Sequence, residues 1–170
     1  SHNPDILYFG ANKLYRSMDR GETWTAISDD LTRAEERGDV PFATITTFSE
    51  SELHFGRLWV GTDDGQLWLT ADGGSTWSDV GGGLPRDRWV SRVVASRVEQ
   101  DRAYVTLNGY RQDDATAYLY VTEDAGSTWR SWAYGLRAEP LNGVREPPVN
   151  ADVLSGGSDR GAYASLDRGA

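Results

Sequence analysis

The sequence contains no cysteine and only one methionine among its 170 residues. Without cysteine the chain can form neither a disulfide framework nor a thiolate metal site. It also lacks any apolar run near the roughly 18 residues that a membrane-spanning helix requires. A disulfide-stapled domain is therefore excluded, and no membrane-spanning helix is expected.

Positive charge is also scarce, because 17 lysine and arginine residues stand against 26 aspartate and glutamate residues. The formal net charge is −9 at pH 7, and the sequence pI is about 4.6. Nucleic-acid-binding proteins gain most of their affinity from basic side chains that neutralise phosphates, and anionic membranes attract the same side chains. The composition therefore predicts no nucleic-acid partner and no membrane partner. We also expect no cofactor and no bound metal.

Aromatic residues, by contrast, are abundant, with seven tryptophans and eight tyrosines. Such side chains favour pleated, half-buried strands over helices. Short runs that alternate apolar and polar residues recur along the chain, as at 57–60 and 66–69, and are bounded by glycine, aspartate or asparagine. Runs of this period are typical of strands joined by tight turns. The sequence therefore predicts an all-β protein.

One eight-residue pattern occurs three times. It has Ser or Thr at its first position and Asp, Gly, Thr and Trp at its third, fifth, seventh and eighth. A fourth copy begins at Ser165 and stops at Ala170. The aspartates of successive copies are 53, 52 and 43 residues apart, near the period of about 40 to 50 residues that is typical of β-propeller blades. The residues of interest are Asp19, Gly21 and Trp24, then Asp72, Gly74 and Trp77, then Asp124, Gly126 and Trp129, and finally Asp167 and Gly169.

The repeat divides residues 1–170, a single partial propeller domain, into about three to four blades of four antiparallel strands. We place blade 1 at about 1–30, blade 2 at about 41–82, blade 3 at about 88–134 and an incomplete blade 4 at about 142–170. Blade 1 is expected to lack its inner strand. Blade 4 is expected to begin with a strand at roughly 144–149 and to lack its outer strand. Because folded proteins rarely leave strand edges open, another polypeptide segment or a second copy should cover them.

Each copy of the pattern is expected to form the turn between the third and fourth strands of its blade. The aspartate can accept hydrogen bonds from backbone amides of the turn, and the glycine can adopt the positive φ that a tight turn needs. The tryptophan is expected to pack between neighbouring sheets. Because the aspartates belong to different blades, they cannot converge on a metal ion. The pattern therefore predicts a structural role.

This pattern resembles the Asp-box, or BNR repeat, of sialidases, xyloglucan-cleaving glycosidases, sortilin-type receptors and a photosystem assembly factor. The resemblance is strongest to large secreted bacterial proteins of the BNR-repeat glycosyl hydrolase or sortilin-like type, and residues 7–11, 59–65, 89–93 and 163–169 carry it. It implies a β-propeller and, for a parent protein, a secreted or cell-envelope location. Since these relatives perform unlike functions, it implies a fold and not an activity.

A hydrolase would need a catalytic set. No Arg-Ile-Pro motif and no arginine triad of the sialidase kind can be assigned, and an ordinary glycosidase needs two carboxyl groups roughly 5 to 9.5 Å apart. Since antiparallel strands alternate in direction, the loops between second and third strands lie at one face, opposite the Asp-boxes. Turn formation and solubility are alternative roles for acidic residues there. The catalytic candidates in these loops are Asp63, Asp64, Asp113 and Asp114.

The sequence leaves two functions open. The first is a non-catalytic propeller segment that provides a binding or assembly surface for a carbohydrate or protein ligand, with self-association through exposed blade edges. The second is part of a glycoside hydrolase of the BNR-repeat type, with its catalytic acids in these loops or in other blades. The lack of a recognisable catalytic set favours the first.

Overall fold

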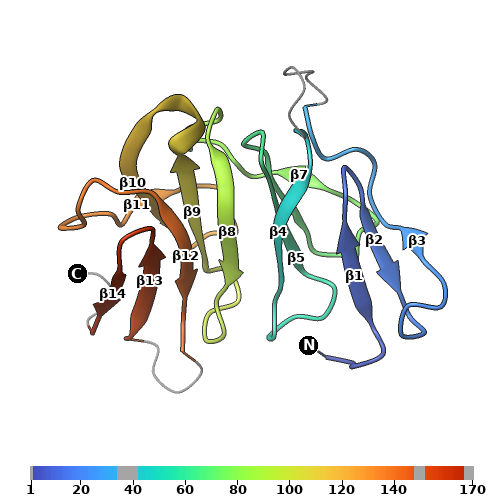
Figure 1. Ribbon diagram of the computed structural model, residues 1–170. Helices are drawn as coiled ribbons and strands as arrows, with labels where there is room; N and C mark the ends of the chain where they lie inside the picture. Colours follow the sequence, from blue (N-terminus) through green and yellow to red (C-terminus); the bar gives the residue numbers. More distant parts are fainter. Residues whose placement is uncertain (1, 34–41, 148–151, 167–170) are drawn as a thin grey trace.

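The computed structural model describes residues 2–33, 42–147 and 152–166. Within these residues the chain forms four antiparallel sheets that stand side by side as blades (Figure 1). The one helix in this part of the chain is a short 3-10 turn, η1 (Tyr110–Gln112). The prediction of an all-β propeller with about three to four blades is confirmed.

Blades 2 and 3 have four strands each, and blades 1 and 4 have three in the described ranges. Blade 1 contains β1 (Leu7–Gly10), β2 (Leu14–Ser17) and β3 (Thr25–Ala26). Blade 2 contains β4 (Ile45–Glu50), β5 (Leu58–Thr62), β6 (Leu67–Thr70) and β7 (Ser78–Asp79). Blade 3 contains β8 (Trp89–Ala95), β9 (Ala103–Gly109), β10 (Asp114–Thr122) and β11 (Arg130–Ser131). Blade 4 contains β12 (Leu141–Arg145), β13 (Leu154–Ser158) and β14 (Ala162–Ser165).

The Asp-boxes identify which strand of a blade each element represents. In blades 2 and 3 the box joins the third strand to the fourth, β6 to β7 and β10 to β11. In blade 1 it joins β2 to β3, so β1, β2 and β3 correspond to the second, third and fourth strands of a blade. Blade 4 contains the first, second and third strands of a blade. Its first strand, β12, comes first in the chain and lies at the edge of its sheet, as β4 and β8 do in theirs.

The apolar core lies between the blades. Every residue of β5 is buried, because blade 2 packs against a neighbour on each side. Leu58 and Val60 belong to the cluster shared with Leu14 of blade 1, whereas Trp59 belongs to the cluster shared with Val93 of blade 3. Since successive side chains of a strand point to opposite faces, one strand serves two interfaces. A third cluster joins blades 3 and 4.

The first strand of blade 4 differs from the prediction. It begins at Leu141 and ends at Arg145, earlier than the expected 144–149, and residues 148 and 149 lie outside the described residues. Leu141 and Val144 are only 1% and 6% exposed. Burial of these two side chains fixes the position of the strand. Apolar and polar residues alternate only weakly in this segment, so the sequence did not indicate where the strand begins.

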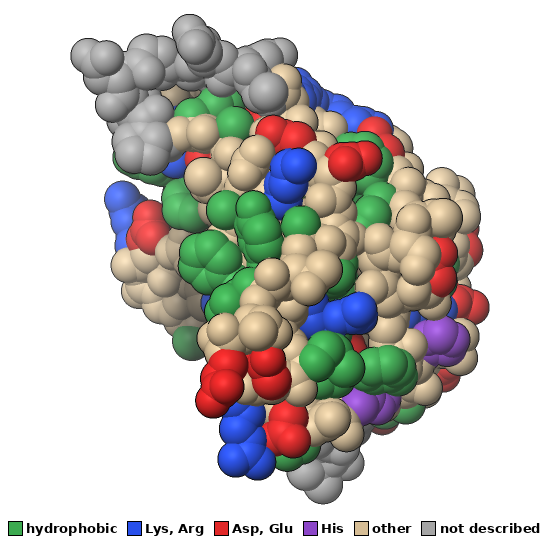
Figure 2. All heavy atoms as spheres, turned by 90° about the vertical axis from the view of Figure 1, so that its right-hand side faces the viewer, with side chains coloured by type: hydrophobic (Ala, Val, Ile, Leu, Met, Phe, Trp, Pro, Cys, Tyr) green, Lys and Arg blue, Asp and Glu red, His purple; other side chains and the backbone are tan. Residues whose placement is uncertain are grey.

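One face of blade 1 is apolar and open. We call it the blade 1 face and define it by Leu7, Phe9, Tyr15 and Trp24. The side chains of Phe9 and Trp24 meet edge to face with ring centroids 6.2 Å apart, and they are 57% and 44% exposed. Figure 2 shows hydrophobic side chains gathered on this side of the molecule. No described residues cover it.

Candidate functional site

The Asp-box of blade 2 is a closed hydrogen-bonded turn. Asp72 accepts hydrogen bonds from the backbone N–H of Thr76 at 2.9 Å, from its hydroxyl at 2.6 Å and from the Thr70 hydroxyl at 2.7 Å. The boxes of blades 1 and 3 repeat these contacts around Asp19 and Asp124. All three carboxylates are therefore fully engaged within their own turns, as the structural interpretation requires.

These contacts give the Asp-boxes a pH dependence. Hydrogen bonds, the largest from the Thr76 hydroxyl, lower the pKa of Asp72 from 3.8 to about 2. Because the folded pKa lies below the unfolded one, the ionised carboxylate stabilises the fold above about pH 4, and this stabilisation is lost as the pH falls toward about 2. We expect Asp72→Asn to be less stable than the wild type at neutral pH and to lose less stability across this acid window. Thermal unfolding midpoints measured over that range check this, and parallel curves for the two proteins would contradict it.

The tryptophans of the boxes connect neighbouring blades. The indole N–H of Trp77 donates to the carbonyl oxygen of Ile27 in blade 1 at 2.9 Å, and that of Trp129 donates to the carbonyl oxygen of Val80 in blade 2 at 2.7 Å. Trp24 differs, because its indole donates within its own box, to the Gly21 carbonyl oxygen at 3.0 Å. Packing between sheets, predicted for all three, thus occurs for two of them. Asp167 and Gly169 of the fourth box lie outside the described residues.

The candidate carboxylates of blade 2 hold loops together. Asp63 is 4% exposed and accepts hydrogen bonds from the Thr44 N–H at 2.8 Å and from the Arg111 guanidinium at 3.2 Å. Asp64 is 3% exposed and accepts one from the Arg33 N–H at 2.6 Å and another from the Thr62 hydroxyl. These contacts join the loop between β5 and β6 to the chain that precedes blade 2 and to η1 of blade 3.

The candidate carboxylates of blade 3 directly follow η1 in the chain. Asp114 accepts hydrogen bonds from the Tyr118 hydroxyl at 2.7 Å and from Arg88 Nη2 at 2.9 Å. Hydrogen bonds, first from Thr116 and then from Tyr118, hold the pKa of Asp114 well below its usual range. Asp113 is exposed and ends η1 in the left-handed conformation with φ 55°.

Three of the four candidate carboxylates lack the surroundings expected of a catalytic general acid. A catalytic general acid requires a raised pKa so that it is protonated near neutral pH, and the environment of Asp114 lowers its pKa instead. Asp63 and Asp64 are nearly inaccessible and already accept hydrogen bonds. Asp113 is the one candidate of the four with an exposed carboxyl group.

The basic partners of these loops were not predicted from the sequence. The Arg111 guanidinium lies over the rings of Phe42 and Trp89, 5.5 and 5.2 Å from their centroids, while it also contacts Asp63. Arg88 bridges Asp87 and Asp114. Arg111 and Asp63 come from different blades and are 48 residues apart, and Arg88 and Asp114 are 26 residues apart within blade 3. No local pattern links either pair.

A buried carboxylate at the opposite end of the sheets was also missed. Glu146 is 1% exposed and accepts hydrogen bonds from the Ser96 hydroxyl, from the Arg97 N–H at 2.6 Å and from the Tyr104 hydroxyl at 2.9 Å. Burial, and next the Glu146 charge, raise the pKa of Tyr104 well above its usual range, so the phenol stays protonated and donates. This network ties blade 3 to the end of β12.

Loss of this carboxylate should destabilise the fold. We expect Glu146→Ala to lower the free energy of unfolding by about 2 kcal/mol, because it leaves buried donors without an acceptor. Glu146→Gln keeps one acceptor oxygen and should cost less than the alanine variant. Urea denaturation measures both, and equal stability of wild type and Glu146→Ala would rule out a stabilising network.

A cavity of about 430 Å³ lies between blades 3 and 4, with Leu119 and Trp132 among its walls. Elsewhere the described ranges hold no group of three or more His, Asp or Glu side chains placed to bind a metal ion. Nor do they contain a helix with the length and apolar character needed to cross a membrane.

Solved structures with the same fold include GH74 enzymes and YCF48 bound to a peptide. The chain aligns over 99% of its length with the GH74 xyloglucanase from Xanthomonas campestris, at 23% identity and a TM-score of 0.75. It aligns over 99% with the GH74 enzyme from Niastella koreensis, at 19% identity and a TM-score of 0.73. A chain of YCF48 bound to D1 peptide aligns over 95% of the protein, at 17% identity and a TM-score of 0.56. The protein spans 28%, 27% and 52% of these three chains.

At these identities the structural similarity shows the fold alone. No curated protein sequence is significantly similar to the chain. A family model described as sortilin, neurotensin receptor 3, matches residues 12–138, a stretch that includes the three complete Asp-boxes. Because this match spans more than half of the sequence, the chain belongs to the Sortilin-Vps10 family.

Proposed function

We propose that this chain is a non-catalytic Asp-box propeller segment that provides an assembly surface, and that the blade 1 face is this surface. The contrast between equivalent residues of two blades carries the proposal. By strand register Phe9 corresponds to Val60 of blade 2. Val60 is 0% exposed because blade 1 covers it, whereas Phe9 is 57% exposed. An open apolar face of this kind is typical of a protein-interaction site.

The Asp-box glycines support the same conclusion. A Cβ atom added at Gly74 would lie 2.5 Å from the carbonyl oxygen of Ile27, since this box packs tightly on blade 1. A Cβ added at Gly21 would meet only Leu7 and Trp24 of its own blade, at 3.5 and 3.7 Å. The box of blade 1 therefore has the shape that packs on a preceding blade but has no described neighbour.

A second copy of the chain is the partner that we propose for this face. The outward face of blade 4 carries small side chains where blade 3 carries large ones, which leaves room for the rings of Phe9 and Trp24. Two copies of four blades would form a ring of about eight, a size within the range of propellers. The small residues are Ser155, Ala162 and Ala164, which by strand register replace Tyr104, Leu119 and Val121.

The absence of cysteine allows a direct test of this contact by cross-linking. We expect a Phe9→Cys, Ala164→Cys double variant to form covalent dimers when oxidised with copper phenanthroline, because blade 1 of one copy would meet blade 4 of the next. The matched control pairs Phe9→Cys with Val98→Cys, an exposed position in a loop of blade 3. Equal dimer yields from the two double variants would refute the head-to-tail contact.

The state of the loop carboxylates supports the non-catalytic part of the proposal. Asp63, Asp64 and Asp114 are occupied in holding loops, and hydrogen bonding lowers the pKa of Asp114. Among proteins of this fold, YCF48 has been seen with a bound peptide, so an Asp-box propeller can serve as a binding scaffold for a polypeptide.

Part of a glycoside hydrolase is the alternative. The shared fold with GH74 enzymes and the exposed carboxyl group of Asp113 favour it. Under the leading proposal the chain releases no reducing ends from xyloglucan. Turnover that is lost in an Asp113→Ala variant, while thermal stability is retained, would establish the alternative and overturn the non-catalytic role.

A further inference from the structure

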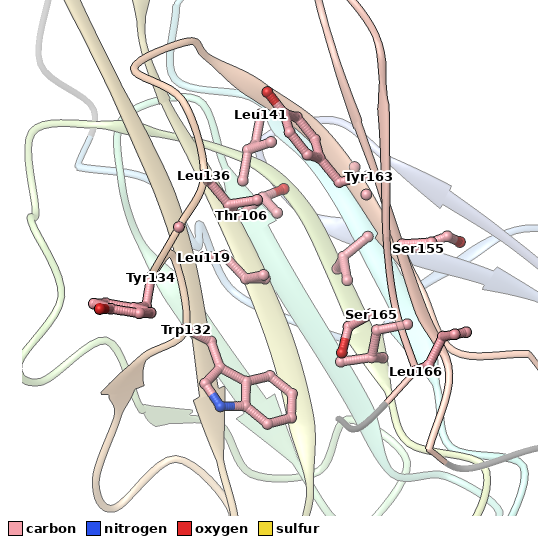
Figure 3. A pocket seen from close by; sticks show the side chains of 16 residues that line it. Thr106, Leu119, Trp132, Tyr134, Leu136, Leu141, Ser155, Tyr163, Ser165 and Leu166 are labelled. Atoms are coloured by element: carbon pink, nitrogen blue, oxygen red, sulfur yellow. The ribbon is translucent and has the colours of Figure 1, made fainter. Parts of the chain in front are cut away.

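A cavity of about 510 Å³ lies between blades 1 and 2. Ala26 of β3 and residues 27–31 form one side, and Trp68 and Trp77 of blade 2 form the other. We call this cavity the 1/2 cavity. The cavity between blades 3 and 4 (Figure 3) is bordered by Leu166, the last described residue. The 1/2 cavity differs from it, because the third and fourth strands of both adjoining blades are present.

Two indole rings form the blade 2 wall of the 1/2 cavity. The indole N–H of Trp77 donates to the Ile27 carbonyl oxygen at 2.9 Å, and that of Trp68 donates to the Leu31 carbonyl oxygen at 2.7 Å. Both rings also pack against the cluster that contains Leu14. Because the rings are fixed without a ligand, binding to them costs little side-chain entropy. Indole rings of this kind attract cations.

A free carboxylate lies beside these rings. Asp29 lines the cavity, is exposed, and makes no hydrogen bond or ion pair within the described part of the chain. Asp30 lines it too, but its carboxylate already accepts hydrogen bonds from the Asn12 amide at 2.8 Å and from the Thr32 N–H at 2.9 Å. The Asp29 carboxylate is therefore open to a ligand, and the charge of Asp30 adds to its potential.

The junction between blades 2 and 3 shows that these acids are not needed for packing. Ile27 and Val80 are equivalent, because each donates its N–H to the third strand of its blade. By this alignment residues 82 and 83, both glycine, replace the two aspartates. Trp129 nevertheless donates to the preceding blade there, as Trp77 does in blade 2. The carboxylates of the 1/2 cavity therefore serve something other than the contact between blades.

The chain does not supply a cation to Asp29. After blade 2, Arg86 pairs with Asp79 at 2.6 Å. Arg33 is at the equivalent place after blade 1, but its guanidinium donates to the Arg86 carbonyl oxygen at 2.7 Å. Neither lysine nor arginine is among the described residues that line the 1/2 cavity. A cation that pairs with Asp29 would therefore come from a ligand.

The other polar groups of the lining favour a ligand that donates hydrogen bonds. Both indole N–H groups are engaged, and the Ser75 hydroxyl donates to the Asp72 carbonyl oxygen at 3.1 Å. A sugar hydroxyl both donates and accepts, whereas an ammonium group only donates. A free carboxylate beside aromatic rings suits the ammonium group better. The net charge of −9 also favours the approach of a cation.

We infer that the 1/2 cavity binds an alkylammonium group, from a free amine or from a lysine side chain of a partner polypeptide. The ammonium group pairs with Asp29, and its alkyl chain packs on Trp68 and Trp77. The site is distinct from the blade 1 face and does not depend on the proposed self-association.

Titration of the ¹⁵N-labelled wild-type chain with n-butylammonium at constant ionic strength tests the inference. We expect saturable shifts of the Trp68 and Trp77 indole N–H resonances, with a dissociation constant in the millimolar range. The Trp129 indole, at the junction without these acids, is the internal control and should not shift. n-Butanol has the same alkyl chain without the charge and should cause no saturable shift.

Two variants separate a local effect of Asp29 from an effect of net charge. Asp29→Asn keeps the shape of the side chain and should weaken the affinity about fivefold, the upper range for an exposed ion pair. Glu22→Gln removes the charge of an exposed acid in the Asp-box of blade 1 and should leave the affinity unchanged. Because Asp29 is exposed and has no hydrogen bond to lose, we expect Asp29→Asn to unfold at the same temperature as the wild type.

A capped Gly-Gly-Lys-Gly-Gly peptide distinguishes the two sources of the ammonium group. Tighter binding of the peptide than of n-butylammonium assigns a polypeptide partner, and weaker or equal binding assigns a free amine.

Several results would overturn the site. Unshifted Trp68 and Trp77 indoles at tens of millimolar amine would do so, as would equal responses to the amine and to n-butanol. Equal weakening in Asp29→Asn and Glu22→Gln would show that only net charge matters. Saturable shifts of the same indoles with cellobiose, and none with the amine, would assign a sugar and contradict the inference.

Discussion

Replacement of Trp129 by alanine is expected to lower the free energy of unfolding by about 3 kcal/mol, the lower end of the usual cost of removing a large aromatic side chain from a core, because the ring is partly buried against its cluster. Its ring meets Trp59 edge to face with centroids 6.1 Å apart, and its indole N–H donates to the Val80 carbonyl oxygen. The variant would leave a cavity between blades 2 and 3. Urea denaturation followed by tryptophan fluorescence measures the loss.

Trp24→Ala is the matched control, because it removes the same residue of the repeat from the one box without a described neighbouring blade. Trp24 is 44% exposed and donates to its own box. In the monomer it should cost about 1 kcal/mol or less, as for most exposed positions. Equal losses for Trp24→Ala and Trp129→Ala would show that packing between blades is not the source of the effect.

Gly126→Ala is expected to destabilise the fold by about 2–5 kcal/mol. Gly126 has φ +84°, where a side chain costs about 1–2 kcal/mol. The new Cβ would also lie 2.6 Å from the Val80 Cβ, and overpacking of this kind adds about 1–3 kcal/mol. Differential scanning calorimetry should show a lower unfolding midpoint.

Gly21→Ala separates the two causes of that loss. It occupies the same position of the box with φ +97°, but its Cβ would meet nothing closer than 3.5 Å. Only the conformational cost of about 1–2 kcal/mol is expected in the monomer. If Gly21→Ala were as destabilising as Gly126→Ala, the contact with the preceding blade would not matter.

The Asp-boxes were predictable because their interactions are local. The Asp72 carboxylate bonds to residues two and four positions away, so eight residues of sequence specify the turn. Repetition of the turn then implied the blades and the packing of their tryptophans.

The loop contacts were not predictable, because they depend on how blades pack. Asp63 and Arg111 are 48 residues apart, and Glu146 and Tyr104 are 42 apart. Neither spacing identifies the two residues as partners in the sequence. The twist of the sheets and the strand register bring them together. The exposure of Trp24 was not predictable for the same reason. Its Asp-box has the same pattern as the boxes whose tryptophans pack between blades, but no described blade covers it.

Light scattering over a concentration series gives the molar mass of the wild-type chain, and so tests whether the blade 1 face joins two copies. Assembly through the blade 1 face predicts a mass that rises from 18.8 kDa toward twice that value, and a Phe9→Asp variant that remains at the lower mass throughout. A wild-type mass of 18.8 kDa at every concentration would contradict the proposal that this face joins one copy to another.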